Sequence, residues 1–165
     1  MKTEDASKPK RYFSPNAIPW PPILLLLAIA GGVVLQMAHP LSWVSGSLED
    51  LFTGFGMFFM VAAIAVDLFC FRIMRNHKTN IMPHRGADHL VTKGPYSISR
   101  NPIYVANVLL VCGLAIVLGN SWMFATAALM AIAIHHLAIK REEAHLELRF
   151  GKAWRDYRKK VRRWL

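Results

Sequence analysis

The chain has 165 residues, of which 54% are hydrophobic, and it carries a formal net charge of +10. A soluble basic protein intersperses its charges with apolar residues, whereas this chain separates the two kinds, so we expect one domain of an integral membrane protein. The same separation argues against a nucleic-acid-binding protein, because membrane topology and anionic lipid headgroups account for the positive charge.

The first half of the chain contains two apolar runs that are long enough to cross a bilayer. A polar arm punctuated by prolines, residues 1–19, precedes them and lacks the cleavage site of a signal peptide. The runs cover residues 20–38 and about 51–71. Each approaches the ~20 residues that a helix needs to span ~30 Å of hydrocarbon. We therefore expect an N-terminal arm followed by two transmembrane helices.

The second half contains two shorter apolar runs, at residues 104–118 and 122–139, with only Gly-Asn-Ser between them. This spacing predicts a tight helical hairpin. All 20 Lys and Arg residues lie before the first run, within 72–103 or after the fourth run. Four spans place these three segments on one side, which the positive-inside rule makes the cytoplasm. The prediction is an all-α polytopic membrane protein with four transmembrane helices, residues 20–165 as one domain and both termini cytoplasmic.

The cytoplasmic segment 72–103 is long for a connection in a compact protein. Its glycines, aromatic residues and histidines favour a functional loop over disorder. Gly94 and Pro95 predict a rigid turn, and Tyr96 and Arg100 share a face if the residues between them are helical. These residues fit an anion-binding entry to the third run. On composition alone they fit an ordinary juxtamembrane turn with a snorkelling arginine somewhat better.

Ionisable residues at the ends of the apolar runs are candidates for substrate contacts. Asp67 lies inside the second run, about one turn from its cytoplasmic end. A carboxylate at that depth indicates either a functional site or an ion pair with Arg72 or Arg100 that pins two helices. His135 and Lys140 flank the end of the fourth run and are the other two candidates.

Two adjacent carboxylates, Glu142 and Glu143, follow the fourth run. An acidic pair beside anionic headgroups is unfavourable unless it meets a cation, and the alternative is a solvated helix face with Glu–Lys or Glu–Arg pairs. His135 precedes Glu142 by seven residues, so one helix face can carry both. We expect no metal site, because the histidines lack metal-ligand spacing and Cys70 and Cys112 lie in apolar runs as packing residues.

The tail, residues 140–165, is predicted to be helical and amphipathic. Apolar residues recur along it at steps of three and four, and Gly151 is expected to divide it into two helices. The stripe comprises Leu146, Phe150, Trp154, Tyr157 and Val161. With Lys and Arg opposite, the last part is typical of a helix that lies on the membrane surface.

Two segments taken together resemble a known family. DHLVTKGPYSISRNPIY, then an apolar hairpin, then REEAHLELRFGKAWRDYRKKVRRWL resembles the isoprenylcysteine carboxyl methyltransferase family. The resemblance is closer to that family's small bacterial members, which are related to phospholipid N-methyltransferases, and it covers residues 72–165. It implies an integral membrane enzyme, in a bacterial inner membrane, that uses S-adenosylmethionine in a pocket facing the cytoplasm.

The resemblance also implies roles for particular residues. Cofactor-binding positions carried over from the family are Asp88, His89, Leu90, Val91, Gly94, Tyr96, Arg100, Asn101, Pro102, Tyr104 and Glu142. Catalytic positions are Glu142, Glu143, Arg100 and Asn101. The substrate candidates Asp67, His135 and Lys140 come from the reading of the apolar runs above and not from the resemblance. The sequence departs from the eukaryotic enzymes at Asn101, where they have histidine, and at Ala138, where they have a substrate-contacting arginine. Both departures weaken the case for a prenylcysteine carboxylate as substrate.

The expected function is therefore methyl transfer to a lipophilic acceptor. Candidate acceptors are an isoprenoid or other lipid-linked carboxylate, a phospholipid amine and a small hydrophobic thiol or amine. Two other classes stay open. One is a non-enzymatic membrane assembly or structural protein. The other is a related membrane reductase that uses a nicotinamide cofactor, for which the chain offers no dinucleotide-binding glycine motif. The expected surroundings are the lipid bilayer and no nucleic acid, and the sequence does not indicate an oligomeric state.

Overall fold

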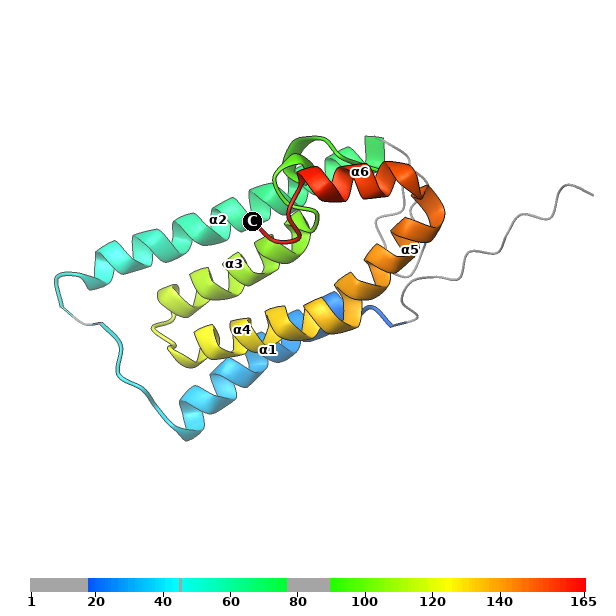
Figure 1. The fold of residues 1–165 in the computed structure, drawn as a ribbon. Helices are drawn as coiled ribbons and strands as arrows, with labels where there is room; N and C mark the ends of the chain where they lie inside the picture. The colour runs from blue at the N-terminus through cyan, green and yellow to red at the C-terminus, as the bar shows by residue number, and fades with distance from the viewer. Residues whose placement is uncertain (1–17, 45, 77–89) are drawn as a thin grey trace, which may run out of the picture.

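A computed structural model describes residues 18–44, 46–76 and 90–165, and all regular secondary structure in these ranges is helical. The elements in chain order are α1 Trp20–Ala38, α2 Glu49–Asn76, the 3₁₀ turn η1 Gly94–Ser97, α3 Pro102–Val117, α4 Trp122–Ile134, the π-helical turn η2 His135–Ile139, α5 Lys140–Phe150 and α6 Lys152–Lys160. Figure 1 shows the four apolar helices running side by side, with α5 continuing from α4 at one end and α6 turning back toward the bundle.

Three helices in the described ranges are long and apolar enough to cross a membrane: Trp20–Ala38, Glu49–Arg75 and Trp122–Phe150. The predicted all-α membrane protein is thereby confirmed. The third apolar run forms the shorter helix α3, whose 16 residues span about 24 Å at the usual rise per residue. The second run was predicted to end near residue 71, but α2 continues to Asn76 because the polar residues that follow still suit a helix.

The helices pack chiefly as two pairs, α1 against α4 and α2 against α3, and the short turn after α3 joins the pairs. Glycines bring α2 and α3 close together. A Cβ atom on Gly113 would lie 2.8 Å from the Gly56 carbonyl oxygen, and one on Gly56 would lie 2.8 Å from the Gly113 carbonyl oxygen. Small residues at a helix contact let two backbones approach, which suits membrane helices that gain little from burying apolar surface against each other.

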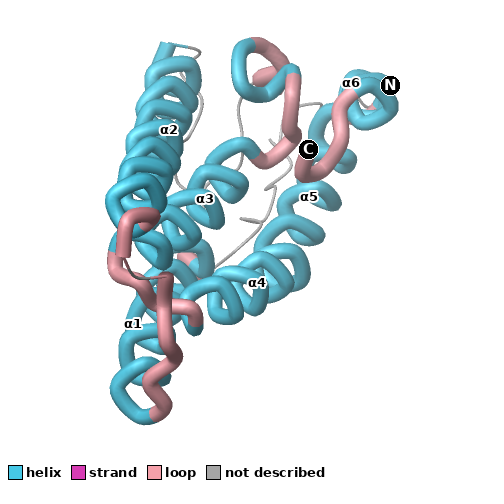
Figure 2. The backbone as a smooth tube through the Cα atoms, turned by 90° about the vertical axis from the view of Figure 1, so that its left-hand side faces the viewer, coloured by secondary structure: helices cyan, strands magenta, loops and turns pink. Residues whose placement is uncertain are grey.

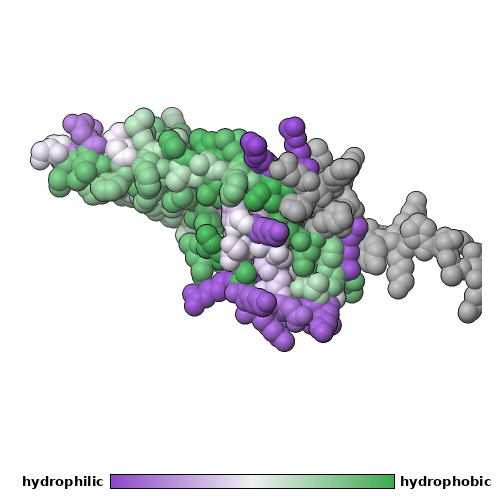
Figure 3. Space-filling model, turned by 90° about the horizontal axis from the view of Figure 1, so that it is seen from above, coloured by the Kyte–Doolittle hydropathy of each residue, from purple (hydrophilic) through white to green (hydrophobic). Residues whose placement is uncertain are grey.

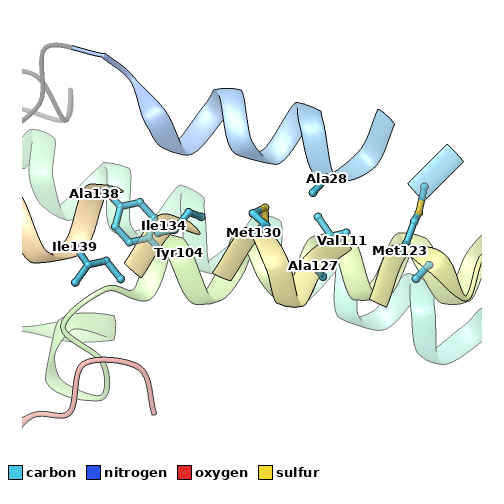
Figure 4. Packing of buried hydrophobic residues seen from close by; sticks show 10 residues of the cluster. Ala28, Tyr104, Val111, Met123, Ala127, Met130, Ile134, Ala138 and Ile139 are labelled. Carbon is cyan, nitrogen blue, oxygen red and sulfur yellow. The ribbon is translucent and has the colours of Figure 1, made fainter. Parts of the chain in front are cut away.

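The buried core lies between the helix pairs and consists of small and flexible apolar side chains. Figure 4 shows Val111 of α3 facing Ala127 and Met130 of α4, with Ala28 of α1 on the other side. Tyr104 extends this core toward the end of the bundle where α4 leaves it. The core is thus continuous with the polar cluster described below.

The outer faces of α1 and α2 expose large apolar side chains that a water-soluble protein would bury. These include Leu26, Leu27, Val34, Phe58, Val61 and Leu68. Figure 3 shows an apolar surface along the bundle, with hydrophilic side chains gathered toward one end and a few at the opposite tip. An apolar band with polar ends is what a lipid bilayer requires of an embedded protein.

Helix α4 continues through the π-turn η2 into α5, so the fourth run and the first part of the tail form one helical rod (Figure 2). Gly151, with φ of +51°, ends α5, which confirms the predicted break. The α6 helix then returns toward η1 and α3. Trp154 and Tyr157 of the predicted stripe are buried against the protein. The expectation that this stripe rests on the membrane is therefore wrong for these two residues.

Candidate functional site

The segment before α3 is shaped by its glycine and prolines, as the sequence predicts. Gly94 has φ of +64°, a conformation that other residues adopt only with strain. Pro95 opens the 3₁₀ turn, and its carbonyl accepts hydrogen bonds from the backbone N–H groups of Ile98 and Ser99, both at 3.1 Å. Pro102 is buried at the start of α3, where its missing N–H costs nothing. The segment thereby presents its tyrosines toward the bundle.

Tyr96 connects η1 to the end of α2 and to α6. Its hydroxyl donates to the Met74 sulfur at 3.2 Å, and its carbonyl oxygen accepts from the Tyr157 hydroxyl at 2.6 Å. Burial raises the pKa of Tyr96 well above its usual range and that of Tyr157 to about 12, so both side chains stay neutral donors. Cys70, one turn before Met74, also lies beside the Tyr96 hydroxyl.

The central contact of the site joins α3 to α5. The Tyr104 hydroxyl donates a hydrogen bond of 2.7 Å to Glu142 Oε1, across 38 positions of sequence. Tyr104 is buried, and Glu142 stands in the first turn of α5, directly beyond the apolar part of the rod. Tyr104 holds one oxygen of this carboxylate, whose acceptor capacity exceeds one hydrogen bond. The pair therefore offers a positioned carboxyl group at the junction of the apolar bundle and the charged tail.

Glu143 has different partners from its neighbour. Its two oxygens accept hydrogen bonds from Arg163, with Nε at 3.0 Å and Nη2 at 2.6 Å, and Arg100 Nη1 lies 3.1 Å from Oε1. Burial lowers the pKa of Arg100 while Glu143 raises it, and the hydrogen bond to Glu143 raises the pKa of Arg163. Glu143 is thus neutralised by two guanidinium groups and not left for a ligand.

The guanidinium group of Arg100 is only partly paired. Its guanidinium carbon lies 5.6 Å from the centroid of the Trp154 ring, within cation–π range. Its side chain is only 8% exposed, yet its Nε makes no hydrogen bond. A buried donor of this kind costs free energy unless a partner arrives. Arg100 can therefore receive an additional anionic group without releasing Glu143.

Asn101 forms hydrogen bonds that hold the backbone around the start of α3. Its side-chain nitrogen Nδ2 donates to the Arg163 carbonyl oxygen at 2.9 Å, and its backbone N–H donates to Ser99 Oγ at 3.1 Å. Its carbonyl accepts from the N–H of Tyr104 at 3.0 Å, in the first turn of α3. These contacts fix the entry to α3 and leave Asn101 little freedom to contact a substrate directly.

The three substrate candidates lie in different surroundings. Asp67 Oδ1 is buried without a hydrogen bond, and Arg100, one of its expected partners, pairs with Glu143 instead. His135 packs edge-on against His136, with ring centroids 5.0 Å apart. Lys140 is exposed, and its Nζ lies 3.3 Å from a ring nitrogen of His136. Of the three, only Asp67 combines burial with an unused acceptor.

The remaining cofactor positions are partly visible. Leu90 and Val91 are half-buried ahead of η1, whereas Asp88 and His89 lie outside the described residues. The site also includes residues that the sequence did not indicate as site residues: Met74, Cys70, Trp154, Tyr157 and Arg163. Cys70 was expected only to pack, and Trp154 and Tyr157 only to belong to the amphipathic stripe. Spacing on α2 could have suggested Cys70 and Met74, which follow Asp67 at three and seven residues on one helix face. In the described ranges, no group of three or more His, Cys, Asp or Glu could hold a metal ion.

Comparison with known proteins assigns the chain to a family. A family model for phospholipid methyltransferases matches residues 51–153, from the start of α2 into α6. The chain belongs to the phospholipid methyltransferase family. The match confirms the resemblance drawn from the sequence and extends it to α2, which the motifs alone did not cover. The family match supports membership of a group of membrane methyltransferases.

Three relatives from bacteria show sequence similarity. An uncharacterised protein of Haemophilus influenzae is 36% identical over 38% of this chain and all of its own length. The nickel-cobalt-cadmium resistance protein NccN of Alcaligenes xylosoxydans xylosoxydans is 30% identical over 73% of this chain. The cobalt-zinc-cadmium resistance protein CzcN of Cupriavidus metallidurans is 31% identical over 66% of it. The chain spans 50% and 45% of those two resistance proteins. No solved structure matches the chain.

Proposed function

We propose that this protein is an S-adenosylmethionine-dependent methyltransferase that acts on a lipophilic acceptor. The observation that carries the proposal is the 2.7 Å hydrogen bond between Tyr104 and Glu142, which sets a carboxylate at the junction of apolar bundle and charged tail. Family membership supports the reaction class. The exposed apolar faces of the helices support an acceptor that arrives from the membrane.

The residues present fit this cofactor by their chemistry. Glu142 has acceptor capacity for an ammonium group or ribose hydroxyls, and the buried Arg100 Nε can donate to a carboxylate. Tyr96 and Tyr104 offer aromatic faces near the Glu142 carboxylate, and such faces suit an adenine ring or a sulfonium cation. When bound, S-adenosylmethionine supplies an electrophilic methyl group on a positively charged sulfur.

The chain's part in the reaction is alignment and exclusion of water. Tyr104 fixes Glu142, and the α2 residues Cys70 and Met74 close one side of Tyr96. Displacement of a methyl group needs the two reacting atoms in line more than it needs a strong acid or base. A nucleophile that must first lose a proton could pass it to Asp67, whose Oδ1 is buried and unpaired. Excluding water favours any step in which opposite charges cancel.

We further propose four membrane spans with both termini in the cytoplasm. All three basic segments can lie on the same side of the membrane only if the number of spans is even. Helix α3 is short, so it would cross with local thinning of the bilayer. In this orientation the Tyr104–Glu142 pair faces the cytoplasm of a bacterial inner membrane, where the cofactor is made. The acceptor class, whether lipid-linked carboxylate, phospholipid amine or hydrophobic thiol or amine, belongs to the same proposal.

The experiment combines cofactor binding with methyl transfer. Detergent-solubilised protein is titrated with S-adenosylmethionine by calorimetry, then incubated with radiolabelled cofactor and a total membrane lipid extract. We expect saturable binding and label in a lipid fraction. Glu142→Gln should lose both. The matched control is Glu147→Gln on the same helix, whose carboxylate pairs with Arg155 and Arg158 at the surface and should behave as wild type.

Three results would contradict the proposal. Absence of binding at millimolar cofactor, with Glu142→Gln indistinguishable from wild type, would favour a non-enzymatic membrane protein. Binding of NADPH in place of S-adenosylmethionine would favour a reductase. Label that appears only in water-soluble thiols would refute a lipophilic acceptor while leaving the methyltransferase intact.

A further inference from the structure

The residues after α6 form a strap, defined here as residues 161–165, that lies across the start of α3. The Arg100 N–H donates to the Arg162 carbonyl oxygen at 2.9 Å, and Ser99 and Arg162 form an isolated parallel bridge. The Arg163 carbonyl oxygen accepts from Asn101 Nδ2 at 2.9 Å and from Ser99 Oγ at 3.3 Å. The strap is therefore bonded through its backbone to three consecutive residues that lead into α3.

The strap is also bonded to α5, through one side chain. Arg163 makes a two-pronged contact with Glu143, the strongest type of arginine–carboxylate pair. Glu143 is 11% exposed and Arg163 34% exposed, so water screens this pair less than a surface pair. Trp164 packs against the buried core next to these contacts. One short segment thus binds both elements that carry the Tyr104–Glu142 pair.

This double attachment has a geometric consequence. Tyr104 follows Asn101 by three residues on the side that the strap backbone holds. Glu142 immediately precedes Glu143 on the side that Arg163 holds. A shift of the strap would therefore change the distance between the Tyr104 hydroxyl and the Glu142 carboxylate. Neither of those two groups is itself in hydrogen-bond contact with Arg163.

We propose that Arg163 is a positioning residue of the site, acting through Glu143 to hold α5 and Glu142 in register with Tyr104. The inference rests on the proposed function, because one of its two tests measures methyl transfer. It divides the acidic pair into two roles: Glu142 faces ligands and Glu143 is the anchor for the strap. The inference also gives Asn101 a positioning role, because the Asn101 side chain holds the strap through the Arg163 carbonyl oxygen.

The first measurement is independent of any cofactor. Amide hydrogen exchange is followed for wild type and for a chain that stops at Lys160. We expect the amides of Arg100 and Asn101 to lose protection in the shortened chain, while α1 and α4 keep theirs. Unchanged protection at residues 99–104 would overturn the structural half of the inference. If the shortened chain does not fold, Arg163→Ala replaces it, and the Tyr104 amide is the reporter.

The second measurement compares turnover across matched variants. Arg163→Ala is expected to lower methyl transfer by about tenfold or more, since small misplacements of reacting groups are costly. Arg163→Lys should recover part of that loss. The double variant Arg163→Ala/Glu143→Gln should be no slower than the slower single variant, because the Arg163 side chain acts through Glu143. Arg158→Ala, which removes an exposed Glu147 partner, should match wild type in turnover and melting temperature.

Outcomes separate the two proposals. Wild-type turnover in Arg163→Ala, or full additivity in the double variant, would overturn the positioning role while leaving the methyltransferase standing. If wild type itself neither binds S-adenosylmethionine nor transfers methyl groups, the proposed function fails. The exchange measurement then decides by itself whether the strap holds the two halves together.

Discussion

The two ends of the α3–α4 hairpin use buried polar groups in opposite ways. At the turn between the helices, the neutral side chain of Asn120 donates to the Gly32 carbonyl oxygen at 2.9 Å and ties the hairpin to α1. At the other end, charged side chains from the segment just before α3, from α5 and from the 161–165 strap gather around Tyr104 and Glu142. A neutral amide suffices to hold helices, so the concentration of charge at one end marks where chemistry is expected.

The largest effect expected at the charged end comes from Glu142→Gln. Loss of this negative charge should lower methyl transfer by roughly 100-fold, the usual scale for removing one preorganised electrostatic group. The measurement is initial rate with labelled cofactor, alongside the melting temperature in detergent. Because the glutamine keeps a hydrogen-bond acceptor for Tyr104, the melting temperature should change little. A large drop in melting temperature with a normal rate would assign Glu142 to stability instead.

A smaller effect is expected from Tyr104→Phe. The phenyl ring retains the packing of the core, and only the hydrogen bond to Glu142 is lost. We expect a loss of about tenfold in methyl transfer, the effect of one hydrogen bond to a charged group. Calorimetry with S-adenosylmethionine checks whether the loss lies in binding or in turnover. A rate equal to that of wild type would mean that Glu142 needs no support from Tyr104.

Between the two ends, Gly113→Ala tests the contact of α2 with α3. The new methyl group would meet the Gly56 carbonyl oxygen, so the helices must separate. We expect the free energy of unfolding to fall by about 1–2 kcal/mol after the gain in helix propensity is subtracted. The matched control is Gly54→Ala, where no atom lies within 4 Å of the added carbon. Equal stability of the two variants would contradict a close helix contact.

The smallest effect is expected at the neutral end, from Asn120→Ala. It removes the hydrogen bond to Gly32 and should lower the free energy of unfolding by about 1 kcal/mol. Methyl transfer by the folded protein should be unchanged. Gln36→Ala, which loses an exposed contact with the Leu41 backbone, should cost less. A variant at Asn120 that folds normally but transfers slowly would remove the distinction between the two ends.

Much of this architecture could be read from the sequence because its causes are local. Apolar runs long enough for a bilayer predicted the spanning helices, and Gly151 predicted the break between α5 and α6. The resemblance to a methyltransferase family, and not a local pattern, implied that the segment before α3 and the acidic pair belong to one site. The count of four spans remains a prediction, since α3 is shorter than the other apolar helices.

The partners inside the site could not be predicted because they depend on long-range contacts. Arg163 reaches Glu143 across 20 positions, and Asn101 reaches Arg163 across 62. No spacing rule links such positions. The sequence also did not reveal that one of the two adjacent glutamates bonds Tyr104 while the other pairs with two arginines. Which carboxylate faces which partner is set by the rotation of α5, and that rotation depends on the turn before it.

That turn, the π-helical His135–Ile139, decides how the rod responds to the loss of a residue. A π-turn accommodates one residue more than an α-helical path between the same two points. Deleting one residue of the five would therefore close the turn to an α-helical path and leave α5 in place, whereas deleting one from the α-helical part of α4 would turn α5 by about 100° about its axis. Exposed side chains such as His136 can vary without moving the acidic pair. The π-turn, unlike the α-helical parts of the rod, is therefore expected to absorb a one-residue deletion without moving the acidic pair.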